Sequence, residues 1–227
     1  MLSGSDREFV RMRKVGSYPR QREILRKSPV SWDTRYRRGH TSWRSAGLSP
    51  VTRRYLRYCT RGSGLLEIGF GAGDDAAELI DLGFSYEGIE LSVAASMQAV
   101  RRLRSRSASL VVGDFFTWRP KNRYAAVYEK GVFHGIFGRR HRFSFARRVA
   151  AVLEPNGLWI TVCGSADRYD PKAPRGAVYL THLVEAVEPF FEILHLEKAK
   201  YGLKKSESDF DAWYGAFRLR PNHKDDQ

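Results

Sequence analysis

Apolar and polar positions along residues 62–221 follow two alternating patterns that predict strands and helices in turn. Short, nearly continuous apolar runs indicate buried strands, and they lie at residues 65–68, 85–92, 109–116, 124–130 and 158–164. The segments between them repeat apolar residues at helical spacing, and they lie at residues 74–82, 93–105, 141–157 and 177–190. Strands that alternate with helices imply a parallel sheet with helices on both faces.

Two further strands are indicated at residues 191–202 and 211–221, and no helical pattern separates them. They must therefore pair as a hairpin, which makes one of them antiparallel to the rest of the sheet. The whole pattern predicts an α/β fold, Rossmann-like and doubly wound, with a mostly parallel seven-stranded sheet and a C-terminal antiparallel hairpin strand.

The N-terminal quarter lacks this regular alternation. Residues 1–28 predict a loosely held arm with one or two short helices, and residues 31–45 an irregular segment rich in Trp, Tyr and Arg. A helix is expected over residues 50–60, because Pro50 suits the first turn of a helix. The residues that this helix would turn inward are Val51, Tyr55, Leu56 and Cys59.

The formal net charge of +14 lies mostly in the first 60 residues, which hold 15 basic and 4 acidic residues for a net charge of +11. Such asymmetry indicates either an anionic partner such as nucleic acid or a solvated, Arg-rich arm. We therefore expect a basic arm with an aromatic cap at residues 1–60, a single core at residues 61–220 and a polar tail at residues 221–227.

Cysteine content, histidine spacing and hydropathy indicate in which cellular compartment the protein is expected and which ligands it lacks. Two cysteines, Cys59 and Cys163, are too few for a disulfide framework or a Cys-rich zinc site. The histidines show no ligand spacing, so we expect no metal. No apolar stretch approaches the length of about 18 residues that a membrane helix needs, and the basic N-terminus has no apolar segment behind it. We expect a reduced, cytoplasmic protein with no membrane partner.

A glycine-rich turn between a buried strand and a helix carries the strongest chemical signal. The segment from Glu67 to Asp74 reads EIGFGAGD, and its glycines permit a tight turn and close approach of a ligand. A dinucleotide fingerprint would need a third glycine at Asp74. Asp74 and Asp75 instead place carboxylates at the helix N-terminus, which is unfavourable for a pyrophosphate, and Glu67 adds another acid. The turn therefore favours a cationic ligand over a phosphorylated one.

Two more acids follow the next two strands. Glu90 can accept hydrogen bonds from both hydroxyls of a ribose. Asp114 can accept a hydrogen bond from the exocyclic amine of adenine, and Phe115 can pack against the ring. A ribose, an adenine and a positive centre without phosphate describe S-adenosylmethionine.

These motifs, together with the segment LEPNG at residues 153–157, resemble class I S-adenosylmethionine-dependent methyltransferases over roughly residues 60–220. The spacing Trp32-x-x-x-Tyr36-x-x-Gly39-x-x-x-Trp43 is similar to the segment that precedes the core in thiopurine S-methyltransferases and related thiol methyltransferases. In that family the segment folds over the cofactor and the acceptor. The resemblance implies the fold and S-adenosylmethionine, with S-adenosylhomocysteine as product, but not a thiopurine substrate.

The segment after the fourth strand is also similar to that family. The run from Tyr128 to Ile136, followed by Arg139-Arg140, matches an acid–basic–glycine motif, although the family usually has Asp then Arg where this chain has Glu129 and Lys130. The bulky His134 also replaces a small apolar residue. These departures leave the acceptor open.

The candidate catalytic residues are His134 and Glu129, because a phenol or amine acceptor needs a nearby base. The candidate cofactor-binding residues are Trp32, Tyr36, Trp43, Glu67, Gly69, Phe70, Gly71, Gly73, Glu90, Leu91, Asp114, Phe115, Glu129 and Lys130. For His134 the alternative is a packing or hydrogen-bonding residue, for Glu129 a helix cap, and for Trp32 and Trp43 core packing.

We expect an enzyme that methylates a sulfur, oxygen or nitrogen atom of a small molecule in an aromatic-lined pocket. An RNA methyltransferase that uses the basic arm is one alternative, and a non-catalytic module that binds an adenosyl ligand is another. The segment from Glu129 to Val132 lacks the Pro-Pro-aromatic motif typical of enzymes that methylate amines of nucleic-acid bases.

Overall fold

The structure, a computed structural model, describes residues 10–15, 29–44, 47–167, 176–201 and 210–221. Within these residues the strands are β1 (Arg11–Lys14), β2 (Gly64–Ile68), β3 (Ser85–Glu90), β4 (Ser109–Val112), β5 (Tyr124–Lys130), β6 (Leu153–Gly164), β7 (Phe191–Lys200) and β8 (Asp211–Leu219). The helices are α1 (Pro29–Arg37), α2 (Pro50–Leu56), α3 (Ala76–Asp81), α4 (Val93–Leu103), the 3₁₀ helix η1 (Phe133–Gly135), α5 (Arg139–Val152) and α6 (Leu180–Val187).

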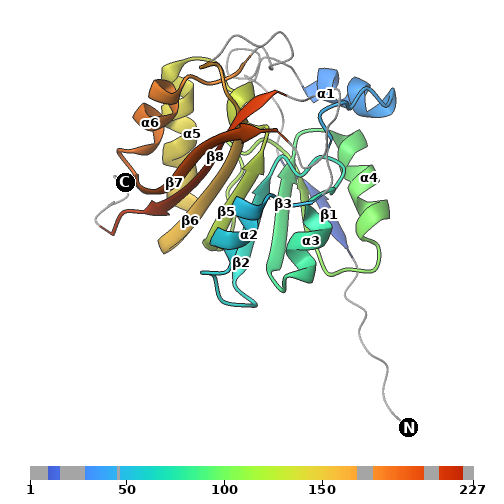
Figure 1. Cartoon of the computed structure of the whole chain (residues 1–227). Helices are drawn as coiled ribbons and strands as arrows, with labels where there is room; N and C mark the ends of the chain where they lie inside the picture. Colours follow the sequence, from blue (N-terminus) through green and yellow to red (C-terminus); the bar gives the residue numbers. More distant parts are fainter. Residues whose placement is uncertain (1–9, 16–28, 45–46, 168–175, 202–209, 222–227) are drawn as a thin grey trace.

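The eight described strands form one sheet in the order β1-β4-β3-β2-β5-β6-β8-β7 (Figure 1). Strand β8 runs antiparallel to both β6 and β7, which confirms the predicted C-terminal hairpin. From β2 the chain moves outward through β3 and β4 and then returns to β5 on the other side of β2. Ligands of open α/β sheets bind at such a reversal, beyond the carboxyl ends of the strands.

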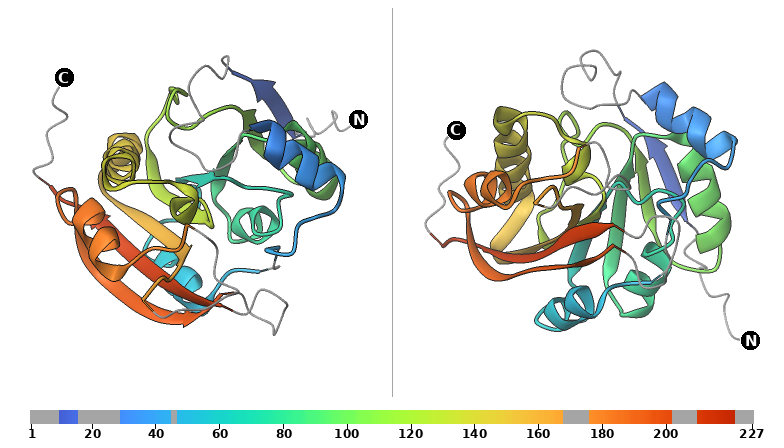
Figure 2. Two further views of the ribbon diagram at one scale, coloured as in Figure 1. Left: turned by 90° about the horizontal axis from the view of Figure 1, so that it is seen from above. Right: turned by 45° about the horizontal axis from the view of Figure 1, so that its top comes forward.

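Helices α2, α3 and α4 cover one face of the sheet, and α5 and α6 cover the other (Figure 2). On the α5 face the Trp159 ring is fully buried among four phenylalanine rings, with centroid separations between 5.4 and 5.9 Å. These rings are Phe133, Phe145, Phe191 and Phe217. Burial of each such ring stabilises the fold by roughly 1.5–3 kcal/mol. Because Phe133 belongs to η1, this core also fixes the loop that follows β5.

Residues 11–14 form strand β1 and not the short helices that were predicted for the arm. The strand pairs in parallel with β4. At its two ends, the Arg11 N–H donates to the Ala108 carbonyl and the Val15 N–H donates to the Val112 carbonyl, both at 3.0 Å. All four side chains of β1 are exposed. The sequence therefore lacks the apolar pattern by which buried strands are recognised, and the sheet gains an eighth strand. The rest of the predicted arm, at residues 1–9 and 16–28, lies outside the described residues.

The aromatic segment is also more regular than predicted, because residues 29–37 form helix α1. Helix α2 begins at Pro50 as expected, with Ser49 as its N-cap, and it ends at Leu56. Tyr55 and Leu56 are buried as predicted, whereas Val51 and Cys59 are half-buried. No helix in the described part of the chain is long and apolar enough to cross a membrane.

Candidate functional site

The turn after β2 is built around three glycines. Gly69, Gly71 and Gly73 have φ values of 72°, 56° and 74°, a conformation that other residues rarely adopt. A Cβ atom on Gly71 would lie 2.6 Å from the hydroxyl oxygen of Tyr36, and one on Gly69 would collide with Val132. Glycine is therefore required for the backbone angles and for the close approach of α1 and of the loop after β5.

Glu90, at the end of β3, places its carboxylate against this turn. One carboxylate oxygen accepts the Gly71 N–H at 3.0 Å, and the other accepts the Ser92 N–H at 2.8 Å. Burial raises the pKa of Glu90, and these backbone donors oppose the rise. The Leu91 N–H also acts on this carboxyl group. A carboxylate offers about four acceptor positions, so Glu90 can still accept a hydrogen bond from a ligand hydroxyl.

Asp114 follows β4 and lies at the same edge of the sheet as Glu90. One of its carboxylate oxygens accepts the Phe116 N–H at 3.0 Å, which closes a turn. The Phe115 ring packs against Phe145 at 5.4 Å between centroids and is buried in the core on the α5 face. Leu91 is half-buried between β3 and α4. Asp114 thus lies at the edge of the sheet where ligands bind, and the Phe115 ring packs in the core; their contacts with adenine stay predictions.

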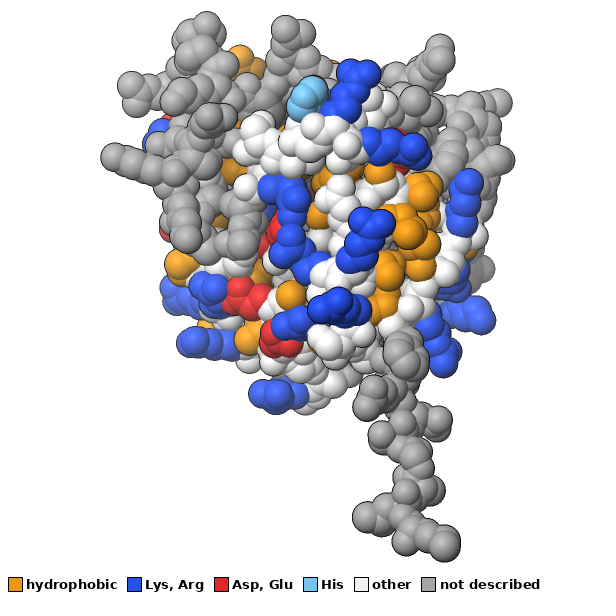
Figure 3. All heavy atoms as spheres, turned by 90° about the vertical axis from the view of Figure 1, so that its right-hand side faces the viewer, with side chains coloured by type: hydrophobic (Ala, Val, Ile, Leu, Met, Phe, Trp, Pro, Cys, Tyr) orange, Lys and Arg blue, Asp and Glu red, His pale blue; other side chains and the backbone are white. Residues whose placement is uncertain are grey.

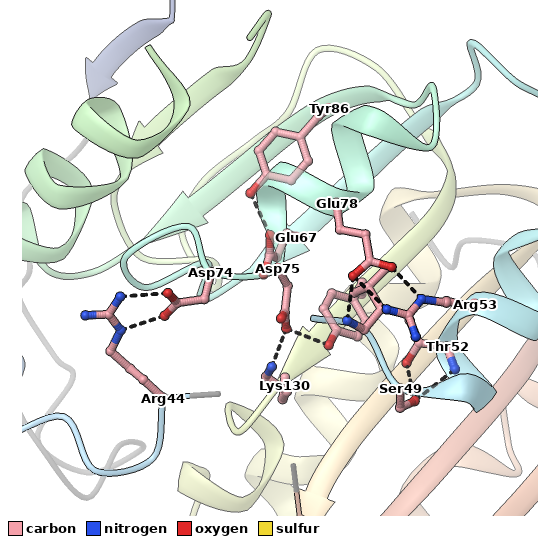
Figure 4. A network of polar contacts seen from close by, with 12 residues as sticks. Arg44, Ser49, Thr52, Arg53, Glu67, Asp74, Asp75, Glu78, Tyr86 and Lys130 are labelled. Atoms are coloured by element: carbon pink, nitrogen blue, oxygen red, sulfur yellow. Dashed lines mark hydrogen bonds and ion pairs between the residues drawn. The ribbon is translucent and has the colours of Figure 1, made fainter. Parts of the chain in front are cut away.

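A buried polar cluster lies beneath the turn, on the α3 face of the sheet (Figure 4). Tyr86 donates to the Glu67 carboxyl at 2.7 Å, and Tyr128 donates to Asp75 at 2.9 Å. The ammonium group of Lys130 lies 2.5 Å from the same Asp75 oxygen. Burial raises the pKa of Glu67 to about 8, and the charge of Asp75 adds to the rise. Glu67 therefore holds a proton at neutral pH, and Asp75 and Lys130 form the ion pair.

The polar side chains of this region are hydrogen-bond acceptors, which suit a nucleoside better than a diphosphate. Glu90 meets the glycine turn directly, while Glu67 is protonated and Asp74 and Asp75 are paired with Arg44 and Lys130. The second oxygen of Asp75, Oδ1, is buried without a hydrogen-bond partner among the described residues. Such an orphaned acceptor is costly unless a donor or a cation reaches it. The site therefore suits the sulfonium, ribose and amino groups of S-adenosylmethionine.

The aromatic segment predicted to lie over the ligands does lie against the glycine turn. Tyr36 is buried with its hydroxyl over Gly71. The Trp43 ring meets Tyr36 and Trp32 edge to face, at 5.9 and 5.5 Å between centroids. Phe70, inside the turn, is also buried, and its ring packs against Gly88 of β3. The structure thus brings together the predicted Trp32, Tyr36 and Trp43 with the glycine turn.

Two polar residues that sequence reasoning missed hold this segment in place. Arg44 binds the Asp74 carboxylate through two hydrogen bonds of 2.6 Å (Figure 4). Asp33 accepts hydrogen bonds from the Ser92 hydroxyl at 2.7 Å and the Ala94 N–H at 2.9 Å, at the start of α4. Both residues lie within the aromatic segment, so its charged positions were the signal that could have found them.

Glu129, at the end of β5, faces the α5 side and is fully buried. It accepts the N–H groups of Val132 and Phe133 at 2.9 and 3.0 Å and the hydroxyl of Thr161. Burial raises the pKa of Glu129 to about 7. These contacts favour a function as the cap of η1. A catalytic or cofactor-binding function of Glu129 stays a prediction.

His134 lies in η1, and its ring is held by the backbone of β6. Its Nδ1 atom accepts the Gly164 N–H at 2.9 Å, so in neutral histidine the proton lies on Nε2. A general base would need a free lone pair on Nε2. Of the two functions that the sequence left open for His134, this tautomer therefore favours a hydrogen-bonding residue over a general base.

Tyr201, which the sequence did not single out, lies beside His134. It follows β7, and its ring stacks on Phe210 at 4.7 Å and lies 6.5 Å from the His134 ring, between centroids. A Cβ atom on Gly131 would lie 3.1 Å from the Tyr201 hydroxyl oxygen. No local motif marks this residue, because the hairpin brings it to the site from far along the chain. Among the described residues, no group of three or more His, Cys, Asp and Glu side chains could hold a metal ion.

The sheet reversal at β2, the glycine turn and the acids after β3 and β4 define a class I S-adenosylmethionine-dependent methyltransferase. Residues 27–209 match the model of the family described as thiopurine S-methyltransferase (TPMT), and the chain belongs to this family. It is therefore a methyltransferase with S-adenosylmethionine as its cofactor.

Individual relatives are distant. The chain is 22% identical over 189 residues to thiocyanate methyltransferase 1 of Brassica oleracea, and the match covers 80% of this chain and 83% of the relative. The structure of 1,6-didemethyltoxoflavin-N1-methyltransferase from Burkholderia thailandensis, solved with bound S-adenosylhomocysteine, has a TM-score of 0.67 at 15% identity, over 84% of this chain and 86% of that one. A structure solved in work on the conversion of a disulfide bond into a thioacetal group during echinomycin biosynthesis has a TM-score of 0.67 at 21% identity, over 84% and 91% of the two chains. At these identities the structural similarity concerns the fold alone.

Proposed function

We propose that the protein transfers the methyl group of S-adenosylmethionine to a sulfur atom of a small-molecule acceptor. The family and the Brassica relative, whose name specifies thiocyanate, favour sulfur over oxygen and nitrogen. The observation that carries the proposal is the aromatic segment folded against the glycine turn, with Tyr36 over Gly71 and Arg44 on Asp74.

This cover favours a small acceptor. Enzymes that act on a base in nucleic acid must admit the extruded base together with its flanking backbone. Here α1 is fastened to α4 by Asp33 and to the turn by Tyr36, so the segment closes one side of the site. A small molecule that enters a covered site is also separated from water, which assists methyl transfer.

The cofactor supplies a methyl group bound to a positively charged sulfur, which makes that carbon electrophilic. In this proposal Glu90 binds the ribose hydroxyls and Asp114 binds the adenine amine. Trp32, Tyr36 and Trp43 line the pocket and exclude water, while Lys130 holds Asp75 in its ionised form.

An acceptor screen tests this function. The protein is incubated with S-adenosylmethionine labelled in its methyl group and a panel of thiols, thiocyanate, phenols, amines and RNA, and products are identified by mass spectrometry. We expect label in small sulfur acceptors and its loss in Glu90→Ala. Binding of S-adenosylhomocysteine with no transfer to any acceptor would instead indicate a non-catalytic module, and label in RNA would indicate a nucleic-acid enzyme.

A further inference from the structure

A basic surface over β1 and α4 lies outside the site described above. Residues 93–113, which contain α4 and β4, hold four arginines and neither Asp nor Glu. Two of these arginines form ion pairs with aspartates of the glycine turn and of α3. The other two, Arg101 and Arg104, are exposed and have no carboxylate partner among the residues that the structure describes. Their charge is therefore not neutralised by a neighbouring acid.

Strand β1 extends this surface at the edge of the sheet. Met12 lies opposite Leu110 of β4, and Leu110 packs in the same apolar cluster as Ala99 and Leu103 of α4. Residues paired in parallel register point to the same face, and so do alternate residues of one strand. Met12 and Lys14 therefore both lie on the α4 side of the sheet. Both are exposed, so β1 adds an apolar side chain and a cation to the surface.

Apolar side chains lie between the cations on this side of the molecule (Figure 3). Val93, Met97 and Arg101 are spaced four residues apart, so they follow one another along one side of α4. Val93 is 37% exposed, Met97 is 41% exposed and Met12 is 42% exposed. A partner that contacts the arginines therefore also meets aliphatic side chains, and its chemistry has to suit both.

Nucleic acid suits only the charged part of this surface. Proteins that bind single strands stack the bases on aromatic side chains, and neither β1 nor α4 contains an aromatic residue. Phosphate contacts with Arg and Lys leave the methionines in water. A second copy of the chain is disfavoured as well, because it would bring two positively charged surfaces together.

A lipid surface that carries negative charge suits both parts. Arg and Lys side chains interact with anionic headgroups, while aliphatic side chains enter the boundary between headgroups and acyl chains. A specific protein interface buries about 800 Å² on each partner around a close-packed apolar core. Three partly exposed side chains do not supply such a core, whereas a bilayer has no fixed shape that the surface must match.

We propose that β1 and α4 form a docking surface for membranes that contain anionic phospholipids. Lys14, Arg101 and Arg104 contact the headgroups, and Met12 and Met97 reach the acyl boundary. Such binding is peripheral, so it needs no membrane-spanning helix. It departs from the expectation of no membrane partner, which was based on the lack of a spanning segment. The proposal goes beyond the proposed function and does not depend on the identity of the acceptor.

Docking would also affect the cofactor site. Helix α1, which belongs to the cover of that site, is joined to the start of α4 by Asp33. The Gln98 side chain of α4 also donates to the Tyr36 carbonyl at 3.1 Å. A membrane bound to α4 would thus lie next to the covered side of the site, where acceptors that partition into lipid are concentrated.

A matched pair of variants tests the charge of the surface. Arg101→Gln with Arg104→Gln removes two cations that lie three residues apart at the end of α4. Arg54→Gln with Arg57→Gln is the control, because these arginines are also exposed, have the same spacing and lie at the end of α2, which contacts β8. Both double variants have the same net charge, so a difference between them depends on the position of the charge.

The measurement is co-sedimentation of the full chain with vesicles of phosphatidylcholine and phosphatidylserine in equal parts, and with vesicles of phosphatidylcholine alone. We expect binding to the mixed vesicles only. Each cation near an anionic surface contributes about fivefold in affinity, so the α4 variant should bind at least about tenfold more weakly, while the α2 variant stays close to the wild type. No binding of the wild type to mixed vesicles, or an equal loss in both variants, would overturn the proposal.

A third variant tests the apolar part and separates lipid from nucleic acid. Met12→Thr with Met97→Gln keeps every charge and uses residues that suit a strand and a helix. We expect severalfold weaker vesicle binding and unchanged RNA binding at the same salt concentration. Vesicle binding equal to that of the wild type, or RNA that displaces the wild type from the vesicles, would overturn the proposal. The melting temperature and the affinity for S-adenosylhomocysteine should stay the same in all variants, which shows that the fold is intact.

Discussion

Glu90 combines two functions in one carboxylate, because it shapes the glycine turn through backbone donors and keeps lone pairs for a ligand. We predict that Glu90→Ala weakens binding of S-adenosylhomocysteine by roughly 1–3 kcal/mol, the usual effect of losing a buried hydrogen-bonding group. Calorimetric titration measures this directly. Glu87→Gln is a suitable control, since Glu87 lies on the same strand and binds Arg13 and Tyr124 instead. Unchanged affinity in Glu90→Ala would remove Glu90 from the site.

Glu67 gives the fold a pH dependence whose sign follows from its raised pKa. A carboxyl with a pKa of about 8 in the folded protein and about 4.3 in the unfolded chain binds its proton more tightly when folded. Its contribution to stability is therefore full at low pH and is lost as the pH rises through that interval. Glu129, with a pKa of about 7, acts in the same direction.

We predict that Glu67→Gln makes the free energy of unfolding fall less steeply with pH, because glutamine imitates the neutral acid and can still accept from Tyr86. Urea denaturation between about pH 5 and about pH 8 covers the relevant interval. Glu129→Gln should flatten the same curve independently. A Glu67→Gln curve parallel to that of the wild type would mean that Glu67 is ionised in the folded protein.

Helix α1 is joined to helix α4 by hydrogen bonds of the Asp33 side chain. Asp33 of α1 accepts hydrogen bonds from Ser92 and Ala94 at the start of α4. Because Tyr36 lies one turn further along α1, this contact helps to hold Tyr36 over the glycine turn. We predict that Asp33→Ala lowers stability by about 1 kcal/mol, as for the loss of a helix cap, and also weakens binding of S-adenosylhomocysteine.

Asp33→Asn is the matched control for this contact, because its amide oxygen can still accept from the Ala94 N–H. Thermal denaturation together with calorimetric titration should therefore rank the wild type first, Asp33→Asn second and Asp33→Ala last. Equal ligand affinity in all three proteins would show that α1 packs on the core without contributing to the site.

The elements of the core could be predicted because burial imposes a sequence pattern on them. The runs at residues 65–68 and 124–130 are mostly apolar because both strands are covered on both faces, and both were placed correctly. Strand β1 is exposed and depends on backbone pairing, so RMRK carries no such pattern. Helix α1 is held by the contacts of Asp33 with α4, which lies far from it in the sequence.

The end of helix α5 was predicted wrongly. Residues 153–157 were expected to close a helix, but helix α5 ends at Val152 and the turn around Asn156 lies within β6.

The site divides in the same way between local and distant contributions. The acids and glycines follow strands directly, so the sequence could place Glu90, Asp114 and the turn at the ends of strands, while their contacts with the cofactor stay predictions. Tyr201 reaches Gly131 only through the C-terminal hairpin, and no local pattern could place it there. The tautomer of His134 depends on the backbone of Gly164, so the sequence could only leave a base and a hydrogen-bonding residue as alternatives, and the geometry favours the second.

At the scale of the whole molecule, positive charge gathers over β1 and α4 (Figure 3). The exposed side chains there include Arg11, Lys14, Arg101 and Arg104, while Arg13 and Arg102 are paired with Glu87 and Asp74. Such a face attracts nucleic acid without sequence preference, and salt weakens that attraction.

We predict that RNA binds weakly, that binding declines steeply with salt, and that RNA neither receives the methyl label nor competes with small acceptors. Filter binding at several salt concentrations, combined with methyl transfer in the presence of RNA, tests this. Incorporation of label into RNA, or salt-resistant binding, would favour the RNA methyltransferase alternative.

A crystal structure of the protein with S-adenosylhomocysteine tests the central claim most directly. We predict that the ribose hydroxyls lie within hydrogen-bond distance of Glu90, that the adenine amine meets Asp114, and that the homocysteine end follows the turn from Gly69 to Gly73. A ligand bound elsewhere on the sheet, or a diphosphate nucleotide accommodated in that turn in its place, would contradict the account.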